Sequence, residues 1–265
     1  MLNCITEPHP YLHAYLEDGV LSLSLHRPDV KNAFNLELYS LLQCAFEQAD
    51  QYKAVRVLIL TGTCSNFSAG NDMKSFFELP DFPAAGQAGS TPPFMMLKAI
   101  AKFSKPCIAA VSGACIGVAN TLLLHFDLVY ADDSATFQMP FVRLGLSLEG
   151  AASRLLVERA GYHQAAEILF LAEKYQANKA YAAGIVNEVV QMPYQYAQKQ
   201  AQYLASLPMV SLKEAKALMK YNLDEILKCI DDEAEVVMQR ATSPEMFEAM
   251  CAFMQKRKPD FSQFH

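Results

Sequence analysis

The sequence predicts an α/β core followed by an all-helical C-terminal region. Two observations support this: short apolar runs with strand character alternate with helical patterns up to residue 192, and only helical patterns follow Pro193. Buried apolar strands that are separated by helices favour parallel pairing through crossover connections. We therefore expect an α/β core at residues 1–192 and a helical region at residues 193–265.

The sequence of the first half of the core predicts a hairpin, a capped helix and a buried strand. Residues 12–17 and 20–25 flank an Asp-Gly pair, and the second arm alternates leucine with serine. Asn35 can cap a helix with an apolar face, and residues 55–60 form an apolar run. The mixed signals of residues 74–93, with four prolines, predict a mobile loop with short helices.

The second half centres on an apolar stretch that is nearly long enough to span a membrane. Pro106 to Leu124 is uncharged, but it has glycines and polar residues at its middle. We interpret it as a buried strand at 107–111, a small-residue turn at 112–117 and a helix from Val118. The other predicted elements are a helix at 94–103, strands at 128–131 and 185–190, and helices at 151–160, 163–171, 177–183, 194–206, 210–220, 223–240 and 244–256.

Composition and termini limit the partners and the location. The chain of 265 residues is 52% hydrophobic with a net charge of −6, so we expect neither a nucleic-acid nor a membrane partner. Its seven cysteines form no CxxC pair and are typical of small buried hydrophobes in a reducing cytosol. Without a targeting signal or metal-ligand spacing, we expect a cytoplasmic protein with no metal site.

Two turns could present backbone N–H groups to a ligand. Ser68–Asp72 follows a predicted strand, and Gly113–Val118 precedes a predicted helix, whose N-terminal N–H groups and dipole favour negative charge. Either turn alone is more often ordinary close packing. Facing each other, they would form an oxyanion hole, in which one donor contributes about 3–4 kcal/mol of transition-state stabilisation.

Glu149 is the candidate general base. It lies among leucines and alanines, and burial there would raise its pKa towards neutrality. The alternative is a carboxylate that stabilises the N-terminus of the helix starting near Gly150, and both interpretations remain open. Asp127, Asp132 and His125 are expected to have structural roles.

The chain resembles the crotonase superfamily, the enoyl-CoA hydratase/isomerases, and is most similar to the peroxisomal-type Δ3,Δ2-enoyl-CoA isomerases. The resemblance runs from about Leu12 to the C-terminus. The matching segments are HRPDVKNAFN, VLILTGTCSNFSAGNDM, KPCIAAVSGACIGVANTLLLHFDLVYADDSATFQMPF, LGLSLEG and AAGIVNEVV.

The resemblance implies a crotonase-like spiral of ββα repeats whose C-terminal helices build a homotrimer or a dimer of trimers. The ligand would be an acyl-CoA thioester, with coenzyme A as part of the substrate and no separate cofactor. Asn71 and Val118 would supply the backbone donors of the oxyanion hole, and Glu149 would be the base. The implied substrate- and CoA-binding residues are Lys31, Ala33, Phe34, Ser68, Ala69, Gly70, Asn71, Asp72, Met73, Gly117, Phe141 and Leu146.

Two departures from the hydratase pattern favour isomerisation. The hydratases carry two glutamates, at positions where this chain has Thr121 and Phe141. The resemblance therefore implies a one-base isomerase that uses Glu149, with Phe141, Leu146 and Phe76 or Phe77 excluding water. The alternatives are weak hydration, ring isomerisation, hydrolysis, or a degenerate acyl-CoA-binding protein without turnover.

Overall fold

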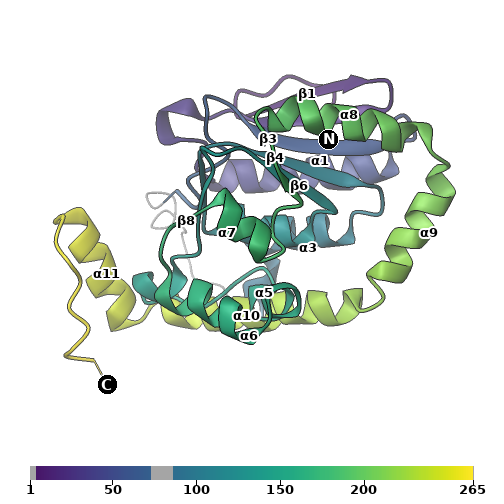
Figure 1. The fold of residues 1–265 in the computed structure, drawn as a ribbon. Coiled ribbons are helices and arrows are strands. Elements are labelled where there is room, and N and C mark those ends of the chain that lie inside the picture. Colours follow the sequence, from purple (N-terminus) through teal and green to yellow (C-terminus); the bar gives the residue numbers. More distant parts are fainter. Residues whose placement is uncertain (1–3, 73–85, 265) are drawn as a thin grey trace.

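A six-stranded sheet forms the centre of the fold (Figure 1). The structure, a computed structural model, describes residues 4–72 and 86–264. The strand order is β1-β2-β3-β4-β6-β9, with β1 and β2 antiparallel and the other neighbours parallel. The strands are β1 Leu12–Glu17, β2 Val20–Leu25, β3 Val57–Gly62, β4 Cys107–Val111, β6 Leu128–Ala131 and β9 Glu188–Val189. The predicted α/β core and N-terminal hairpin are confirmed.

Helices cover both faces of this sheet. The helices α1 (Leu36–Gln51) and α3 (Pro92–Lys102) pack together on one side of it, with α1 behind the strands in Figure 1, and α8 (Pro193–Ser206) lies on the other side, in front of the strands. Successive side chains of β2 point to opposite faces of the sheet, so this strand contributes to the helix layers on both sides. Leu21 and Leu23 belong to the larger core cluster, whereas Val20 packs with α8. Asn35 caps α1 as predicted, accepting a 2.9 Å hydrogen bond from the N–H of Leu38.

A second, three-stranded sheet was not predicted. Its strands are β5 (Ala114–Ile116), β7 (Thr136–Gln138) and β8 (Tyr175–Gln176), in the order β5-β7-β8. The prediction of a turn over residues 112–117 was therefore wrong at its centre. Strands of two or three residues are too short for an alternating pattern, and their pairing depends on partners distant in sequence.

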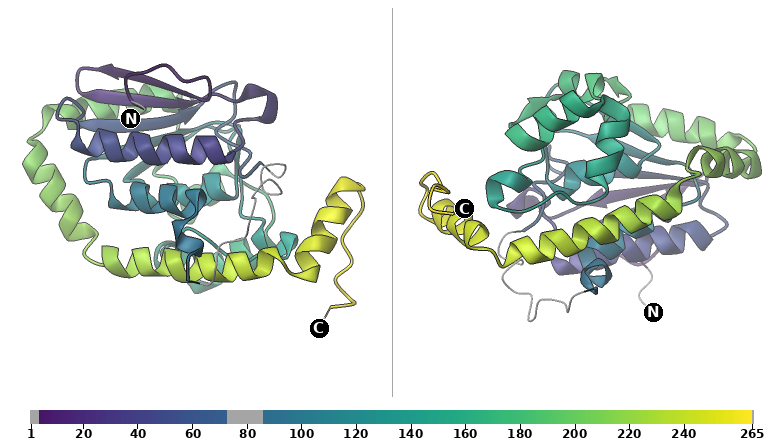
Figure 2. Two further views of the ribbon diagram at one scale, coloured as in Figure 1. Left: turned by 180° about the vertical axis from the view of Figure 1, so that it is seen from behind. Right: turned by 90° about the horizontal axis from the view of Figure 1, so that it is seen from below.

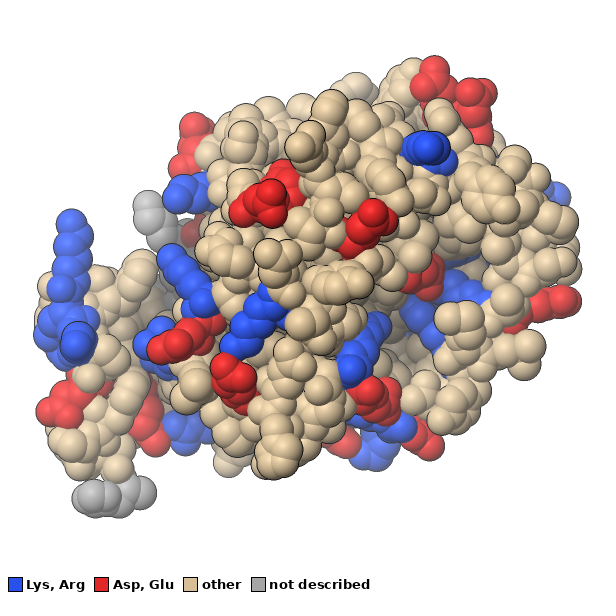
Figure 3. Space-filling view, in the orientation of Figure 1, with Lys and Arg blue, Asp and Glu red and all other residues tan. Residues whose placement is uncertain are grey.

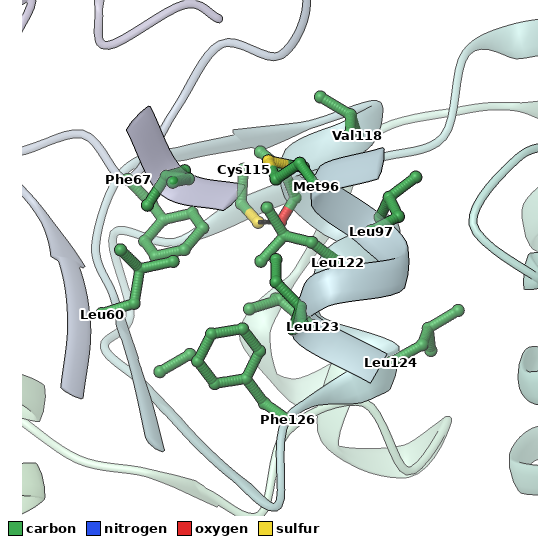
Figure 4. Close-up of a cluster of buried hydrophobic side chains, with 14 of the residues drawn as sticks. Leu60, Phe67, Met96, Leu97, Cys115, Val118, Leu122, Leu123, Leu124 and Phe126 are labelled. Carbon is green, nitrogen blue, oxygen red and sulfur yellow. Dashed lines mark hydrogen bonds between the residues drawn. The ribbon is translucent and has the colours of Figure 1, made fainter. Parts of the chain in front are cut away.

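The helix predicted from Val118 is short. The α-helix α4 (Val118–Thr121) continues as a 3-10 turn at Leu122–His125, which buries all four of its residues. Figure 4 shows Leu122 and Leu123 pointing into an apolar cluster that includes Met96 of α3 and Phe126. This packing, and not a long hydrogen-bonded helix, holds Val118 in place.

The remaining helices of the core follow the predicted order with changed boundaries. They are α5 (Ala152–Ala160), α6 (Tyr162–Ala166), a π-helical turn at Glu167–Leu171 and α7 (Ala177–Ala182); short 3-10 helices lie at Pro28–Val30, Ala88–Ser90 and Phe141–Leu144. β3 begins two residues later than predicted. The strand predicted at 185–190 is only the two-residue β9. Ile185 and Val186 donate their N–H groups to Ala180 of α7 instead, whereas Asn187 and Val190, on either side of β9, donate theirs to Val129 and Ala131 of β6.

The C-terminal helices wrap around the core. After α8, α9 (Met209–Met219) descends along one side, α10 (Leu223–Ala241) passes beneath the core and α11 (Pro244–Met254) projects at the far end (Figures 1 and 2). The apolar stripe of α10 is buried, and α10 packs against α3. The predicted helical region is confirmed, and the domain boundary at residue 192 stays a prediction.

Two observations concern the expected partners. Within residues 4–72 and 86–264, no helix is both long and apolar enough to cross a membrane. On the face drawn in Figure 3, acidic and basic side chains are interspersed, and neither sign forms an extended patch.

Candidate active site

A cavity of about 330 Å³ lies between the loops that follow the strands and the helices α10 and α11. Its lining is mostly apolar and comes from distant parts of the chain. The lining residues are Leu36, Tyr39, Ala69, Gly70, Asn71, Thr91, Pro93, Phe94, Ile116, Gly117, Val118, Pro140, Phe141, Leu144, Leu146, Glu149, Val237, Met238, Met246, Met250 and Phe253.

The first predicted donor, Asn71, is held by a short parallel bridge. Phe34 donates its N–H to Gly70 (2.8 Å) and accepts a hydrogen bond from the N–H of Asp72 (2.7 Å). In a parallel bridge these bonds turn the N–H of the intervening Asn71 away from Phe34. In the described part of the chain, that N–H contacts no acceptor, so it is available to a ligand in the cavity.

The second predicted donor, Val118, follows a turn at Gly117. Gly117 has a φ of +59° and donates its N–H to Gln138 (2.8 Å), which anchors the turn to β7. The N–H of Val118 also has no acceptor among the residues described. Because α4 has only four residues, the helix field expected here is weak. The available group is the N–H itself.

Gly70 allows the two donor segments to approach each other. Its φ is +85°, a left-handed conformation, and a Cβ at this position would lie 2.4 Å from the carbonyl oxygen of Ile116. Ile116 precedes the Gly117–Val118 turn. A residue without a side chain is therefore required for Asn71 and Val118 to border one cavity.

Glu149 is the single carboxylate among the cavity-lining residues of the described chain. It is 7% exposed, and burial raises its pKa to about 8. The negative charge of Glu233 acts in the same direction, while a hydrogen bond from the hydroxyl of Thr121 to Oε1 opposes them. A carboxyl group with this pKa can both accept and return a proton near neutral pH.

Glu233, and not Glu149, is the carboxylate at the N-terminus of α5. Its side chain accepts hydrogen bonds from the N–H groups of Ala151 (2.6 Å) and Ser153 (3.0 Å). The alternative interpretation of Glu149 as a helix-stabilising carboxylate is therefore not the arrangement observed.

His125 has the structural role that was predicted. Its Nε2 lies 2.8 Å from the carbonyl oxygen of Gly150, and burial lowers its pKa to about 3. The neutral ring therefore donates to this oxygen. Asp127 is also structural, since it pairs with the buried Lys216 at 2.7 Å and accepts the N–H of Cys107.

The structure brings most of the predicted site residues to the cavity, but not all of them. Asn71, Val118 and Glu149 line it, together with Ala69, Gly70, Gly117, Phe141 and Leu146. Lys31, Ala33, Phe34, Ser68 and Asp72 do not. Met73, Phe76 and Phe77 lie outside the described residues.

The predicted residues that do not line the cavity have structural contacts. The side chains of Phe34 and Ser68 are fully buried, and Ser68 Oγ accepts the N–H of Gly70 at 3.1 Å. Asp72 forms an ion pair with Arg27 at 3.2 Å. The carbonyl of Lys31 accepts the N–H of Ala69 at 2.9 Å. Their predicted contacts with coenzyme A stay predictions.

Tyr39 and the methionines of the C-terminal helices were missed by the sequence analysis. The hydroxyl of Tyr39 donates to Asn71 Oδ1 at 3.2 Å, and burial together with the charge of Glu149 raises its pKa well above 10, so it stays neutral. Met238, Met246 and Met250 form the far wall. These residues belong to two different helices, α10 and α11, and only the fold brings them to one cavity.

The residues present offer no metal site within 4–72 and 86–264, where no three histidine, cysteine or acidic side chains cluster. Among its described lining residues, the cavity presents one buried carboxylate, two backbone donors and the hydroxyl of Tyr39, surrounded mostly by apolar side chains.

Comparisons with known proteins agree on the family. The protein-family model described as enoyl-CoA hydratase/isomerase matches residues 16–264 of this chain. Human enoyl-CoA delta isomerase 2 is 32% identical over 91% of this chain, which spans only 62% of that relative's length. The 2,3-dehydroadipyl-CoA hydratase of Escherichia coli K12 is 30% identical, with 92% of this chain and 96% of the relative covered.

The fold is confirmed by solved structures. A chain from Acinetobacter baumannii that is described as an enoyl-CoA hydratase/isomerase superposes with a TM-score of 0.87 at 54% identity. The match covers 91% of this chain and 100% of that one. The crotonase-like fold expected from the sequence is therefore correct.

Proposed function

The chain belongs to the enoyl-CoA hydratase/isomerase family, and from this premise we propose that it is a Δ3,Δ2-enoyl-CoA isomerase. The reaction would move a double bond from a 3-enoyl-CoA to give the conjugated 2-trans-enoyl-CoA, in the degradation of fatty acids or related acyl-CoA compounds. Relatives of similar identity include both isomerases and hydratases, so the choice between the reactions depends on the site.

The observation that carries the proposal is that Glu149 is the one carboxylate among the described residues that line the cavity. Hydration in this family uses two glutamates, and this chain has Thr121 and Phe141 at those positions. Thr121 is fully buried and Phe141 lines the cavity. Neither side chain can activate water or deliver a proton to carbon, whereas a double-bond shift requires only one base.

In the proposed reaction Glu149 acts first as base and then as acid. The ionised carboxylate removes a proton from C2, so that the C2–H bond breaks and an O–H bond forms on Glu149. The electron pair moves into the thioester carbonyl and gives a dienolate. The same carboxyl group then returns the proton to C4, which leaves the double bond between C2 and C3.

The N–H groups of Asn71 and Val118 would hold the thioester oxygen while it carries negative charge. Neither N–H contacts an acceptor in the described part of the chain, and both residues border the cavity. Donors fixed before the reaction stabilise a developing oxyanion by about 3 kcal/mol each in an apolar site. The apolar wall around them would exclude water, which favours return of the proton over hydration.

The proposal includes a homotrimer or dimer of trimers acting on an acyl-CoA thioester in the cytoplasm, without a separate cofactor. Large apolar side chains remain exposed on the C-terminal helices, among them Leu218 (78%), Met219 (81%) and Phe247 (72%). Surfaces of this kind support self-association.

The direct test is incubation with 3-enoyl-CoAs of several chain lengths while the absorbance of the conjugated product is followed. Glu149→Gln should lower kcat by at least about 1,000-fold while acyl-CoA binding is retained. The matched control is Glu173→Gln, which changes an exposed glutamate and should leave the rate unchanged. Absence of conjugation at every chain length would rule out the isomerase.

The same preparation separates the alternatives. Addition of water to a 2-enoyl-CoA would indicate a hydratase, and release of free coenzyme A would indicate a hydrolase. Tight binding of acyl-CoA with no product would indicate a binding protein. A substrate that carries deuterium at C2 tests the one-base route, which predicts that part of the label is found at C4 of the product.

A further inference from the structure

Thr121 is placed to orient the carboxyl group of Glu149. Its side chain is fully buried at the end of α4, and its hydroxyl contacts Oε1 of Glu149 and, at 3.2 Å, the carbonyl oxygen of Val118. It does not line the cavity. Thr121 therefore contacts the carboxyl group from the protein interior and not from the cavity.

The two oxygens of Glu149 are consequently not equivalent. Oε1 accepts the hydroxyl of Thr121, whereas Oε2 has no hydrogen-bond partner in the described chain. Among those residues, Asn120 Oδ1 is the one fully buried side-chain polar atom without a partner. Oε2 is therefore reached from the cavity, which Glu149 lines.

The hydroxyl of Thr121 has one proton and two acceptors within reach. A hydrogen bond to an ionised carboxylate is roughly twice as strong as one to a neutral carbonyl, so the proton points to Oε1 when Glu149 is charged. While Oε1 is an acceptor, a proton bound by Glu149 belongs on Oε2. This geometry matters for a one-base reaction, because the proton must be collected and returned by the oxygen that faces the substrate.

We propose that Thr121 is a positioning residue. Its hydroxyl donates a hydrogen bond to Oε1 of Glu149, so that Oε2 is the single oxygen that takes the C2 proton and returns it to C4. This inference rests on the proposed isomerase function. It assigns a role to Thr121, which occupies the position of one of the two hydratase glutamates. Threonine at this position removes one of the carboxyl groups needed for hydration and orients the carboxyl group of Glu149.

Thr121→Val tests the proposal, because valine keeps the shape of threonine and removes the donor. Without the hydroxyl, the charged form of Glu149 is less stable. The carboxyl group can also rotate in the cavity. We expect kcat to fall about 10- to 100-fold with little change in KM. The pH at which kcat/KM is half-maximal should rise by about one unit, and transfer of deuterium from C2 to C4 should decrease.

Thr121→Ser is the matched control, because it keeps the hydroxyl and removes only a methyl group. It should restore the wild-type pH profile and most of the label transfer. The proposal would be overturned if the valine variant kept the wild-type profile and label transfer, or if the serine variant were as impaired as the valine variant.

A second measurement separates this proposal from the isomerase assignment. The ionisation of Glu149 can be followed without substrate by ¹³C NMR of glutamate side-chain carboxyl groups, assigned with Glu149→Gln. The titration of Glu149 should move to higher pH in Thr121→Val and not in Thr121→Ser. If wild type shows no isomerase activity but this movement occurs, the isomerase proposal fails while the orienting contact stands; an unmoved titration overturns the role of Thr121.

Discussion

Glu233, on the C-terminal helix α10, accepts a hydrogen bond from the N–H of Ala151 at 2.6 Å, two residues beyond Glu149. It is 8% exposed and also accepts the N–H of Ser153. The loop that carries the candidate base is thus fixed by a helix from outside the α/β core. A buried negative charge beside that loop also raises the pKa of Glu149. One residue therefore contributes both to the position and to the basicity of the base.

Glu233→Gln should lower the pKa of Glu149. The amide oxygen can still accept one of the two N–H groups, but the negative charge is lost. We expect the rise of kcat/KM with pH to move to lower pH by up to about one unit, opposite to the effect of Thr121→Val. The weakened cap of α5 should cost about 1 kcal/mol of unfolding free energy, measurable by urea denaturation.

The control for this prediction is Asp232→Asn on the same helix. Asp232 is exposed and pairs with Lys228 four residues earlier, so its loss should leave the pH profile in place. A profile for Glu233→Gln that is unchanged, or that moves to higher pH, would contradict the electrostatic role of Glu233.

The pH dependence of the wild-type enzyme follows from the pKa of Glu149, about 8. The base must be ionised to remove the C2 proton, so kcat/KM should rise roughly tenfold per pH unit below pH 8 and level off above it. Steady-state assays between about pH 6 and about pH 9.5 check this, since that range spans the titration. A profile already level at pH 6 would show that Glu149 titrates as an ordinary carboxyl group.

Glu149→Gln should stabilise the fold at alkaline pH. The folded-state pKa is about 8 against the ordinary 4.5, so the folded protein holds a proton that the unfolded chain releases between these values. Wild-type stability, relative to a variant that cannot ionise here, therefore falls as the pH rises from 4.5 to 8. We expect the variant to gain on the order of 3–5 kcal/mol at about pH 9 and little at about pH 5.

Urea denaturation at these two pH values measures the difference, with Glu173→Gln as the exposed control. Equal effects of the two substitutions at high pH would indicate that the buried charge of Glu149 does not strain the fold. A stabilised but inactive variant would instead show that the site is costly to maintain, as expected for a base kept in an apolar cavity.

Much of the fold could be predicted because its signals are local. The hairpin at residues 12–25, the cap at Asn35 and the helices after Pro193 each follow from turn residues or hydrophobic periodicity within one segment. The strands β5, β7 and β8 could not be predicted in this way. The longest has three residues, and each is defined by a partner in another segment.

The site shows the same division. The sequence indicates Glu149 and the two small-residue turns, because their residue types and their order match a family pattern. The contacts that give Glu149 its properties cross long sequence separations, 28 residues to Thr121 and 82 between Ala151 and Glu233. A single sequence does not indicate which distant side chains meet, so the contacts of Thr121 and Glu233 required the structure.

The last prediction concerns Gly70, which allows the segments that carry the two backbone donors to approach each other. Gly70→Ala would place a Cβ 2.4 Å from the carbonyl oxygen of Ile116, so the segments that carry Asn71 and Val118 must move apart. Because the donors act only at a fixed separation, we expect kcat/KM to fall at least about 100-fold. Gly161→Ala is the control: its φ of +76° is also positive, but no atom lies within 4 Å of the new Cβ. Both variants should lose about 1–3 kcal/mol of unfolding free energy because alanine is strained at a positive φ, with a further loss in Gly70→Ala from the clash. Steady-state kinetics and urea denaturation of the pair separate the effects, and equal activity of the two variants would show that the approach of the two segments is not needed for turnover.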